Sequence, residues 1–549
     1  MFQRSIGLLL FYRNFATRNR LNNYQMKQYF RELFGGKFFD KQNNQTSMMM
    51  KKQTISSTVS TSSSSLDYRE EKDTLGIVRV PVNRLYGAQT QRSLNNFHIG
   101  TMDWNPEQMP KELIRAFILL KKACAHVNQL NGDLDERRAQ AIQQACDIIL
   151  DEQKIDMKHE FPLIIWQTGS GTHTNMNCNE VLANLAMKIL NDNNADEKTV
   201  KIHPNDHCNR SQSSNDTFPT AMHIAIALEL NGKLLPALEQ LYKSLLTKQM
   251  EFVNIIKIGR THLQDATPIT LGQEFSAYSQ QIKFSIDRIK SVLEPRIYYL
   301  AIGGTAVGTG LNSPEGWDNA VCEEISRITG LNFRPAPNKF EALSSNDVMV
   351  ELSGVLNVLA CSLNKIANDI RWLASGPRSG LGELSLPELE PGSSIMPGKI
   401  NPTQSESMTM ICAQIQGNHL AVTIGGMQGH FQLNVFKPMI IANILRSSRL
   451  LTDSMQSFRL NCIDHIRPNE KRIKQLMQNS LMLATALNPY IGYDQAALLA
   501  RTAYKEDARL KDTAIKLGMM TGEQFDEWIK PDEMIRPTKK NETRKKFLK

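Results

Sequence analysis

Three long segments with apolar residues three and four positions apart constrain the fold of this chain more than any other feature. They span residues 276–293, 348–374 and 408–422, and glycine and proline fall largely in the connections. This spacing places the apolar side chains along one face of an α-helix. Because long helices bury such faces against one another, we expect a mainly all-α fold built around a helical bundle.

The length and the distribution of charge limit the class of protein further. At about 150 residues per domain, 549 residues allow three to four domains. The net charge of +9 is concentrated at the ends, since residues 1–66 carry 10 basic and 2 acidic side chains and residues 536–549 carry 7 and 1. Residues 67–535 are therefore mildly acidic, which argues against a nucleic-acid partner. No apolar run approaches the roughly 20 residues of a membrane helix, so we expect no membrane span.

The amino-terminal region has the composition of an organelle-targeting sequence. Arginines such as Arg4, Arg13 and Arg18 alternate with Leu and Phe, and the first acidic residue is Glu32. An Arg-rich, acid-poor and amphipathic segment is typical of a mitochondrial transit peptide, which we place at residues 1–40. The Leu-rich patch also allows a secretory signal, but neither a small-residue cleavage site nor a disulfide framework accompanies it.

The polar segments at both ends are predicted to lack a fold. Residues 41–66 are rich in Ser and Thr and bury too little apolar area to offset their ordering entropy, so we predict a disordered linker. Residues 536–549 form a basic tail, which we interpret as a solvated charge run. The eight cysteines are at least 22 residues apart, which excludes a CxxC pair and suits free thiols in a reducing compartment.

Four polar segments, each followed by a helical pattern, are the main functional features. Each combines Ser, Thr or Asn with Gly or Pro, and they span residues 168–177, 211–217, 259–267 and 392–401. Asn or Thr directly before Pro is typical of a helix N-cap followed by the first turn. Free N–H groups and the positive end of the dipole make a helix amino terminus receptive to anions.

These segments also carry neutral hydrogen-bond donors and one lysine. The residues are Ser170, Thr172, Ser213, Ser214, Asn215, Thr261 and Lys399. If the segments converge, they form a pocket for a small carboxylate. For any one segment alone, ordinary helix capping is the simpler interpretation. The density of donors over four segments favours a binding site.

Three further residues in or beside the segments are suited to catalysis. His262 is a candidate general acid or base, Glu406 is a carboxylate able to orient it, and Ser393 is a hydroxyl beside flexible glycines. His203 and His207 are four residues apart, but a proline lies between them and no third ligand is evident, so we expect no metal.

Residues 303–310 are rich in glycine but lack the Lys-Ser/Thr ending of a phosphate loop. We interpret them as a tight connection between helices.

The fourth polar segment resembles the signature of the aspartase/fumarase superfamily. Residues 392–404 read Gly-Ser-Ser-Ile-Met-Pro-Gly-Lys-Ile-Asn-Pro-Thr-Gln, and the other three segments resemble family motifs in the same order. The similarity extends from about residue 77 to residue 531, through residues 336–342, 429–437 and 486–493. Gly398 and the Thr403-Gln404 pair resemble the class II, iron-independent fumarases, whereas aspartases usually carry Ala at the first of these positions.

The resemblance implies a role for each residue of the predicted site. Ser393, on a mobile loop, is implied to be the base that takes the C3 proton of malate, which gives a carbanion held as an aci-carboxylate. His262 with Glu406 is implied to manage the water at C2. The implied substrate-binding residues are Ser170, Thr172, Ser213, Ser214, Asn215, Thr261, Ser394, Lys399 and Asn401. His203, Pro204, Asn205 and Asp206 resemble the second anion site of the family.

The resemblance also implies an architecture and a setting. It implies three domains, an amino-terminal lyase domain at 67–211, a central domain with a long five-helix bundle at 212–469, and a small carboxy-terminal domain at 470–535. It implies a homotetramer in which each site is built from three subunits. The implied reaction is the hydration of fumarate to L-malate in the tricarboxylic acid cycle, without a cofactor, in the mitochondrial matrix, with a cytosolic pool left open.

Two other functions remain as alternatives. One is an ammonia-lyase acting on aspartate, from the same superfamily, and the other is a catalytically silent structural relative. The silent relative is disfavoured because Ser393, His262, Lys399 and Asn401 are all present. The family commonly has Gln at the position of His173 and Arg at that of Leu185, and neither change replaces a residue assigned to chemistry.

Overall fold

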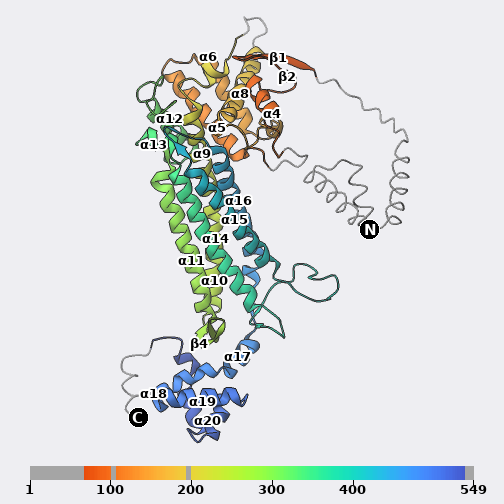
Figure 1. Cartoon of the computed structure of the whole chain (residues 1–549), viewed down its shortest axis with the longest axis vertical. Helices are drawn as coiled ribbons and strands as arrows, with labels where there is room; N and C mark the ends of the chain where they lie inside the picture. Colours follow the sequence, from red (N-terminus) through yellow and green to blue (C-terminus); the bar gives the residue numbers. More distant parts are fainter. Residues whose placement is uncertain (1–66, 101–106, 193–199, 538–549) are drawn as a thin grey trace, which may run out of the picture. The chain divides into compact units, whose positions relative to one another are not determined.

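The computed structural model describes residues 67–100, 107–192 and 200–537, within the compact unit Asp67–Lys549. The predicted transit peptide at 1–40, the linker at 41–66 and residues 538–549 of the basic tail lie outside the described residues. The described part is mainly α-helical, so the predicted fold class is confirmed (Figure 1). Five short two-stranded sheets, which the apolar spacing does not predict, occur within the same ranges.

Five long helices pack side by side in the centre of this unit (Figure 1). They are α10 (Leu235–Glu251), α11 (Leu271–Val292), α14 (Asp347–Leu373), α15 (Thr403–Gly426) and α16 (Lys437–Asn461). α14 packs on α11, α15 and α16, while α10 packs on α11 and α16. The three predicted helical segments lie in α11, α14 and α15, and the predicted central bundle is confirmed.

The longest helical run within the described residues joins two ends of the bundle. α9 (Ser214–Glu229) continues through the π-helical turn η2 (Leu230–Leu234) into α10, because the backbone keeps right-handed helical angles at both junctions. The wider turn precedes Pro236, which lacks an N–H to donate. At about 1.5 Å per residue, the run from Ser214 to Glu251 is roughly 55 Å long.

α14 is long and apolar enough, by length and composition, to cross a membrane. Its buried residues recur at helical spacing from Met349 to Leu373, and they face three neighbouring helices of the bundle. The burial pattern is that of a core helix in a helical protein. We therefore assign α14 to the core of the bundle.

The amino-terminal part of the unit packs two short strands and several helices above one end of the bundle. Its elements are β1 (Tyr68–Asp73), β2 (Gly76–Pro81), α4 (Ala88–Asn96), α5 (Lys111–Leu130), α6 (Glu136–Leu150), α7 (Met157–Glu160), α8 (Thr172–Asp192) and η1 (Pro204–Cys208). β1 and β2 form an antiparallel hairpin in which Tyr68 pairs with Pro81 and Asp73 with Gly76.

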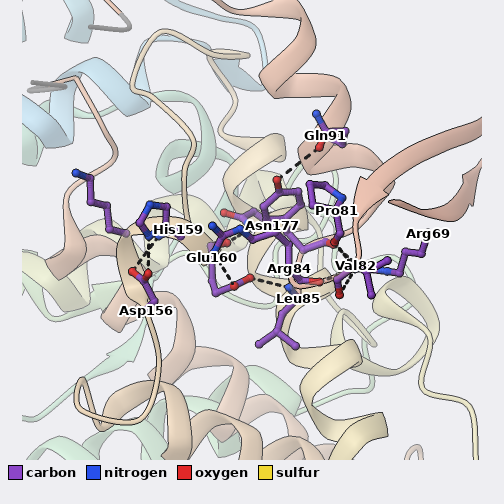
Figure 2. A network of polar contacts seen from close by, with 12 residues as sticks. Arg69, Pro81, Val82, Arg84, Leu85, Gln91, Asp156, His159, Glu160 and Asn177 are labelled. Carbon is purple, nitrogen blue, oxygen red and sulfur yellow. Dashed lines mark hydrogen bonds and ion pairs between the residues drawn. The ribbon is translucent and has the colours of Figure 1, made fainter. Parts of the chain in front are cut away.

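A polar network around Glu160 ties this hairpin to α8 (Figure 2). The buried Glu160 carboxylate accepts the N–H of Leu85 at 2.7 Å and lies 3.5 Å from the Arg84 guanidinium. The Glu160 carbonyl accepts the side-chain amide of Asn177 on α8 at 2.9 Å. Arg69 donates to the carbonyls of Pro81 and other residues before α4. These bonds fix the first turns of α8 against the hairpin.

Short elements complete the unit. Around and between the long helices lie β3 (Ile256–Thr261), β4 (Gln264–Thr270), η3 (Leu293–Ile297), β5 (Tyr299–Leu300), α12 (Trp317–Thr329), β6 (Arg334–Pro335), α13 (Lys339–Ser344), β7 (Leu384–Ser385), β8 (Gly429–His430), β9 (Leu433–Asn434), η4 (Ile463–His465) and β10 (Arg467–Pro468). The carboxy-terminal elements are α17 (Glu470–Asn479), η5 (Leu481–Leu487), α18 (Asn488–Ile491), α19 (Tyr493–Lys505), α20 (Leu510–Lys516), α21 (Gly522–Trp528) and η6 (Pro531–Glu533). β5 and β6 pair in parallel, and the other strand pairs are antiparallel.

Two hydrophobic cores organise these elements. The larger extends from Val78 to Ile473 and is continuous across the predicted boundary at residues 211 and 212. The smaller extends from Leu483 to Ile529, within the segment predicted as a carboxy-terminal domain. The division into three domains stays a prediction. All eight cysteines lie in the described part, and none forms a disulfide.

His223 on α9 predicts a specific loss of stability in mild acid. Its imidazole is hydrogen-bonded to the Ile297 carbonyl, and burial lowers its pKa from 6.5 to about 4. Between these values the unfolded chain binds a proton that the folded chain does not, so stability is complete above pH 6.5 and falls as the pH decreases. At pH 5 the loss is about 2 kcal/mol. Between pH 7 and pH 5 we expect the free energy of unfolding of His223→Gln to fall by about 2 kcal/mol less than that of the wild type. Urea unfolding at the two pH values measures this difference.

Equal losses of stability in the variant and the wild type would show that another group dominates the acid sensitivity.

Candidate active site

Three hydroxyls of the predicted binding set form one hydrogen-bonded chain. Thr172 and Ser214 are the first residues of α8 and α9, and their hydroxyl oxygens are 2.7 Å apart. The Ser170 and Thr172 hydroxyl oxygens are 2.9 Å apart. The amino termini of two long helices therefore meet at a row of neutral donors. This arrangement suits an anion.

Ser213 and Asn215 are held beside this row by the capping of α9. Ser213 is the N-cap, and its hydroxyl accepts the N–H of Asn215 at 3.2 Å. The Asp216 carboxylate completes the cap by accepting the N–H of Ser213 at 2.9 Å. The side-chain amide of Asn215 donates to the carbonyl of Ala306 at 2.8 Å. The Gly-rich segment 303–310 therefore borders this group of residues.

Asp216 and Lys121 lie beneath the turn, and neither was predicted from the sequence. Asp216 is fully buried and also accepts the N–H groups of Gly303 and Thr305, at 3.1 and 2.9 Å. Burial raises the Asp216 pKa to about 6 in spite of these hydrogen bonds. Lys121 donates to the side chains of Asn209 and Gln212, and burial lowers its pKa to about 8. The Ser213-Ser-Asn-Asp216 capping box was a readable signal for Asp216, whereas nothing local marks Lys121.

Thr261 and His262 lie at the tip of the β3–β4 hairpin. Thr261 pairs with Gln264, so His262 and Leu263 form the two-residue turn. Both turn residues have positive φ angles, 57° and 59°, a conformation that non-glycine residues seldom adopt. Backbone strain of this kind gathers at functional sites. The His262 side chain is exposed at the tip.

Buried ion pairs anchor this hairpin. Arg260 pairs with both oxygens of Glu383, at 2.7 and 3.2 Å, and Lys257 lies 3.1 Å from Glu383 and 3.0 Å from Glu274. Lys257 and Glu383 are fully buried. The hairpin that presents His262 is thus fixed to the segment that leads toward Ser393.

Glu383→Gln should destabilise the protein strongly, because it leaves the buried Lys257 and the partly buried Arg260 facing a neutral amide. Breaking a buried pair in this way costs about 3–5 kcal/mol. The matched control is Glu351→Gln, since Glu351 makes a similar two-pronged pair with Arg296 on the surface. Exposed pairs contribute at most about 1 kcal/mol. We expect a clear decrease in Tm for the first variant and a small one for the second, and equal decreases would contradict this assignment.

The segment 392–401 forms a compact exposed loop before α15. The Ser393 hydroxyl accepts the N–H groups of Ile395 and Met396, at 3.3 and 3.1 Å. The Asn401 amide donates to the Gly392 carbonyl and closes the loop. A Cβ at position 392 would lie 1.9 Å from the Lys399 carbonyl oxygen, so only glycine fits there. Ser394, Lys399 and, in the first turn of α15, Glu406 are exposed.

The structure places the predicted site residues at two ends of the bundle, not at one, and the two sets are called the two groups below. Ser170, Thr172, Ser213, Ser214 and Asn215 lie at the start of α9, whereas the hairpin of Thr261 and His262 follows the far end of α10. The roughly 55 Å helical run separates them, and Figure 1 shows β4 at the opposite end of the bundle from α9. Ser393, Ser394, Lys399, Asn401 and Glu406 follow α14 at the hairpin end (Figure 1).

The predicted second anion site forms its own short element. His203 is the N-cap of η1, and its imidazole nitrogen lies 3.3 and 3.2 Å from the N–H groups of Asn205 and Asp206. Pro204 occupies the first turn, and the imidazole of His207 accepts the N–H of His203 at 2.7 Å. Within the ranges that the structure describes, no group of three His, Cys, Asp or Glu side chains is placed to hold a metal ion.

Comparisons with known proteins identify the class. A family profile described as "Lyase" matches residues 76–417, and one described as "Fumarase C C-terminus" matches residues 483–536. The mitochondrial fumarate hydratase of Rattus norvegicus is 58% identical over 475 residues, 86% of this chain and 92% of the relative. That of Dictyostelium discoideum is 56% identical over 87% of this chain and 96% of the relative. The class II fumarase structure from Schistosoma mansoni is 44% identical, with a TM-score of 0.82, over 86% of this chain and all of that one.

The chain therefore belongs to the lyase family, in its class II fumarase branch. It is a hydro-lyase that acts on a dicarboxylate, and its activity is the reversible hydration of fumarate to L-malate in the tricarboxylic acid cycle. Its location is mitochondrial, as in the relatives. The sequence-based identification of fold class, family, reaction and compartment is confirmed.

Proposed function

We propose that Ser393 is the base that removes the C3 proton of malate, with His262 and Glu406 handling the water at C2. The observation that carries this proposal is the Ser393 turn, in which two backbone N–H groups already point at the serine oxygen. Donors of this kind stabilise an alkoxide, and a serine needs such help to act as a base near neutral pH. Lys399, six residues on in the same compact loop, adds a positive charge.

In this proposal the two groups of residues bind different parts of the substrate. Ser170, Thr172, Ser213, Ser214 and Asn215 bind a carboxylate at the amino termini of α8 and α9. Thr261, Ser394, Lys399 and Asn401 bind the reacting end and hold the negative charge of the aci-carboxylate intermediate. Hydrogen bonds that strengthen as this charge develops lower the barrier of the reaction. His203, Pro204, Asn205 and Asp206 supply a second, separate anion site.

A site assembled from these two groups requires more than one chain, so the working enzyme is proposed to be a homotetramer. α15 supports this, because it exposes apolar side chains at helical spacing. The exposed residues are Met410, Leu420 and Ile424 in the helix and Met427 at its C-cap, with 47–72% of each residue accessible. A helix that is apolar all round is normally buried, and an exposed apolar face of this kind marks an interface. Light scattering of the purified protein tests the assembly, and a stable, active monomer would contradict it.

The reaction itself is tested by following the loss of fumarate absorbance beside an ammonia-release assay with aspartate. We expect turnover of fumarate and malate only. Release of ammonia from aspartate at a comparable rate would assign the chain to the alternative lyase reaction.

Residues 1–40 are proposed to be the transit peptide that accounts for the mitochondrial location. Amino-terminal sequencing of the protein recovered from mitochondria should find a new start beyond this segment. An unprocessed Met1 would reject the proposal.

A further inference from the structure

Lys437, the first residue of α16, is a buried cation without a partner in the described part of the chain. Its side chain is fully buried, and its ammonium nitrogen makes no hydrogen bond there. Burial without a partner is costly for a charge, and the amino terminus of a helix adds a partial positive charge of its own. Burial accordingly lowers the Lys437 pKa to about 7. A group held at such a cost indicates a function that the isolated chain does not display.

The surroundings of Lys437 place it beside the α8/α9 residues. A Cβ on Gly169 would lie 1.5 Å from the carbonyl oxygen of Val435, so the backbone before α16 packs directly on the backbone before α8. α16 also packs on α9, and the charge of Lys437 interacts with that of Asp216. Three helix amino termini therefore meet around the Ser213–Asn215 turn, and one of them carries an ammonium.

A second buried polar group without a partner lies at the same place. The hydroxyl of Thr305 is buried and makes no hydrogen bond within the described residues. Its N–H donates to Asp216, and its φ angle is +53°, so the backbone is held in an unfavourable conformation. Thr305 belongs to the Gly-rich segment 303–310, for which the sequence predicts only a tight connection between helices. Two groups that lack partners thus flank Asp216.

We propose that the Lys437 ammonium and the Thr305 hydroxyl bind one carboxylate of the dicarboxylate substrate, together with the α8 and α9 hydroxyls. This proposal rests on the fumarate hydratase activity and on the α8/α9 residues being part of the site. The α8 and α9 donors are all neutral, and Lys399 comes from the other end of the bundle. A dianion is matched in charge when each carboxylate meets one lysine. Contact with the anion also favours the charged form of Lys437.

Lys437→Met and Lys437→Gln test this proposal in the assembled enzyme. Both remove the charge, and Gln retains a donor. We expect kcat/KM for fumarate to fall about 100-fold in each, mainly through KM, as for loss of a buried charged partner. The Tm of Lys437→Met should equal or exceed that of the wild type, because an unpaired buried charge is removed. Succinate, a dicarboxylate without the reacting double bond, should raise the Tm of the wild type and not that of either variant.

Lys248→Met is the matched control. Lys248 is also buried in the bundle, but it donates to Glu251 and to the Ile466 carbonyl. We expect Lys248→Met to have a lower Tm, because Glu251 and the Ile466 carbonyl lose their hydrogen-bond donor. Its kcat/KM should stay within about threefold of the wild-type value.

Three outcomes would overturn the proposal. An unchanged kcat/KM and succinate response in the Lys437 variants would show that the ammonium does not meet the substrate. A decrease in Tm with loss of the assembly would show that an acidic group of another subunit is the partner of Lys437. Retention of activity by Lys437→Gln alone would reject the role of charge. Failure of the wild type to hydrate fumarate would instead contradict the assigned reaction, so the two failures are distinct.

Discussion

Replacing Ser393 with alanine should lower kcat for fumarate hydration by about 100- to 10,000-fold while leaving the assembly and its Tm unchanged. The expected size follows from the loss of a positioned proton-transfer group, which contributes about 10²–10⁴-fold. The side chain is only partly buried, and within the described residues its hydroxyl serves the loop by accepting two N–H groups. In the variant the loop keeps the hydrogen bond from the Asn401 amide to the Gly392 carbonyl. It also keeps the close packing of Gly392 on the Lys399 backbone. The loss is therefore expected in chemistry and not in folding.

Hydrogen exchange at C3 of malate separates the base from a binding residue. In D2O the wild type should exchange this hydrogen, and Ser393→Ala should not, even at saturating malate. Ser385→Ala is the control, because Ser385 is an exposed serine in β7, eight positions before Ser393 in the same chain. Fumarate turnover near the wild-type rate in Ser393→Ala would reject the serine as the base.

The helical bundle could be predicted from the sequence because its cause is local. Apolar residues three and four positions apart recur in α11, α14 and α15, and polar caps such as Thr270 with Gln273 mark where a helix starts. The β3–β4 hairpin was not predicted, although His262 was named. Its turn contains neither Gly nor Asn, so the usual signal of a two-residue turn is absent.

The supports of the site could not be predicted, because they join residues far apart in the chain. Glu383 pairs with Arg260 across 123 positions, and Asp216 accepts the N–H of Thr305 across 89. Neither partner carries a local pattern that points to the other. The unpaired state of Lys437 is likewise a property of its surroundings, and its sequence context is an ordinary helix start with a following proline.

The separation of the two groups explains why the sequence motifs are so widely spaced. Each long helix runs from one end of the bundle to the other, so motifs at helix starts alternate between the two ends. Ser213 and Ser214 lie at the start of the α9–α10 run, and His262 lies after its end. Ser393 lies after the end of α14, which runs along the bundle in the same direction. In the proposed assembly a single chain therefore presents two half-sites about 55 Å apart, as set by the length of the helical run. Antiparallel packing of several chains can bring unlike half-sites together.

Mixing two inactive variants should therefore restore activity. One variant is Ser393→Ala, and the other combines Thr172→Val with Ser214→Ala at the opposite end, where loss of two donors removes about 10²–10³-fold each. In a randomly mixed tetramer, a site that takes its α8/α9 half from one chain and its Ser393 half from another is intact in about a quarter of cases. We expect about a quarter of the wild-type activity after the two proteins are unfolded and refolded together.

The controls make this result specific to shared sites. Each variant refolded alone should stay inactive, and the two variants mixed without unfolding should remain inactive until subunits exchange. A triple mutant with all three substitutions in one chain, refolded with the wild type, should also give about a quarter of full activity, because each half must then come from a different wild-type chain. Recovery close to zero in the mixture of single-end variants would place both halves of a site in one chain. That result would contradict the separation of the two groups along the α9–α10 run, and with it the requirement for a multimer.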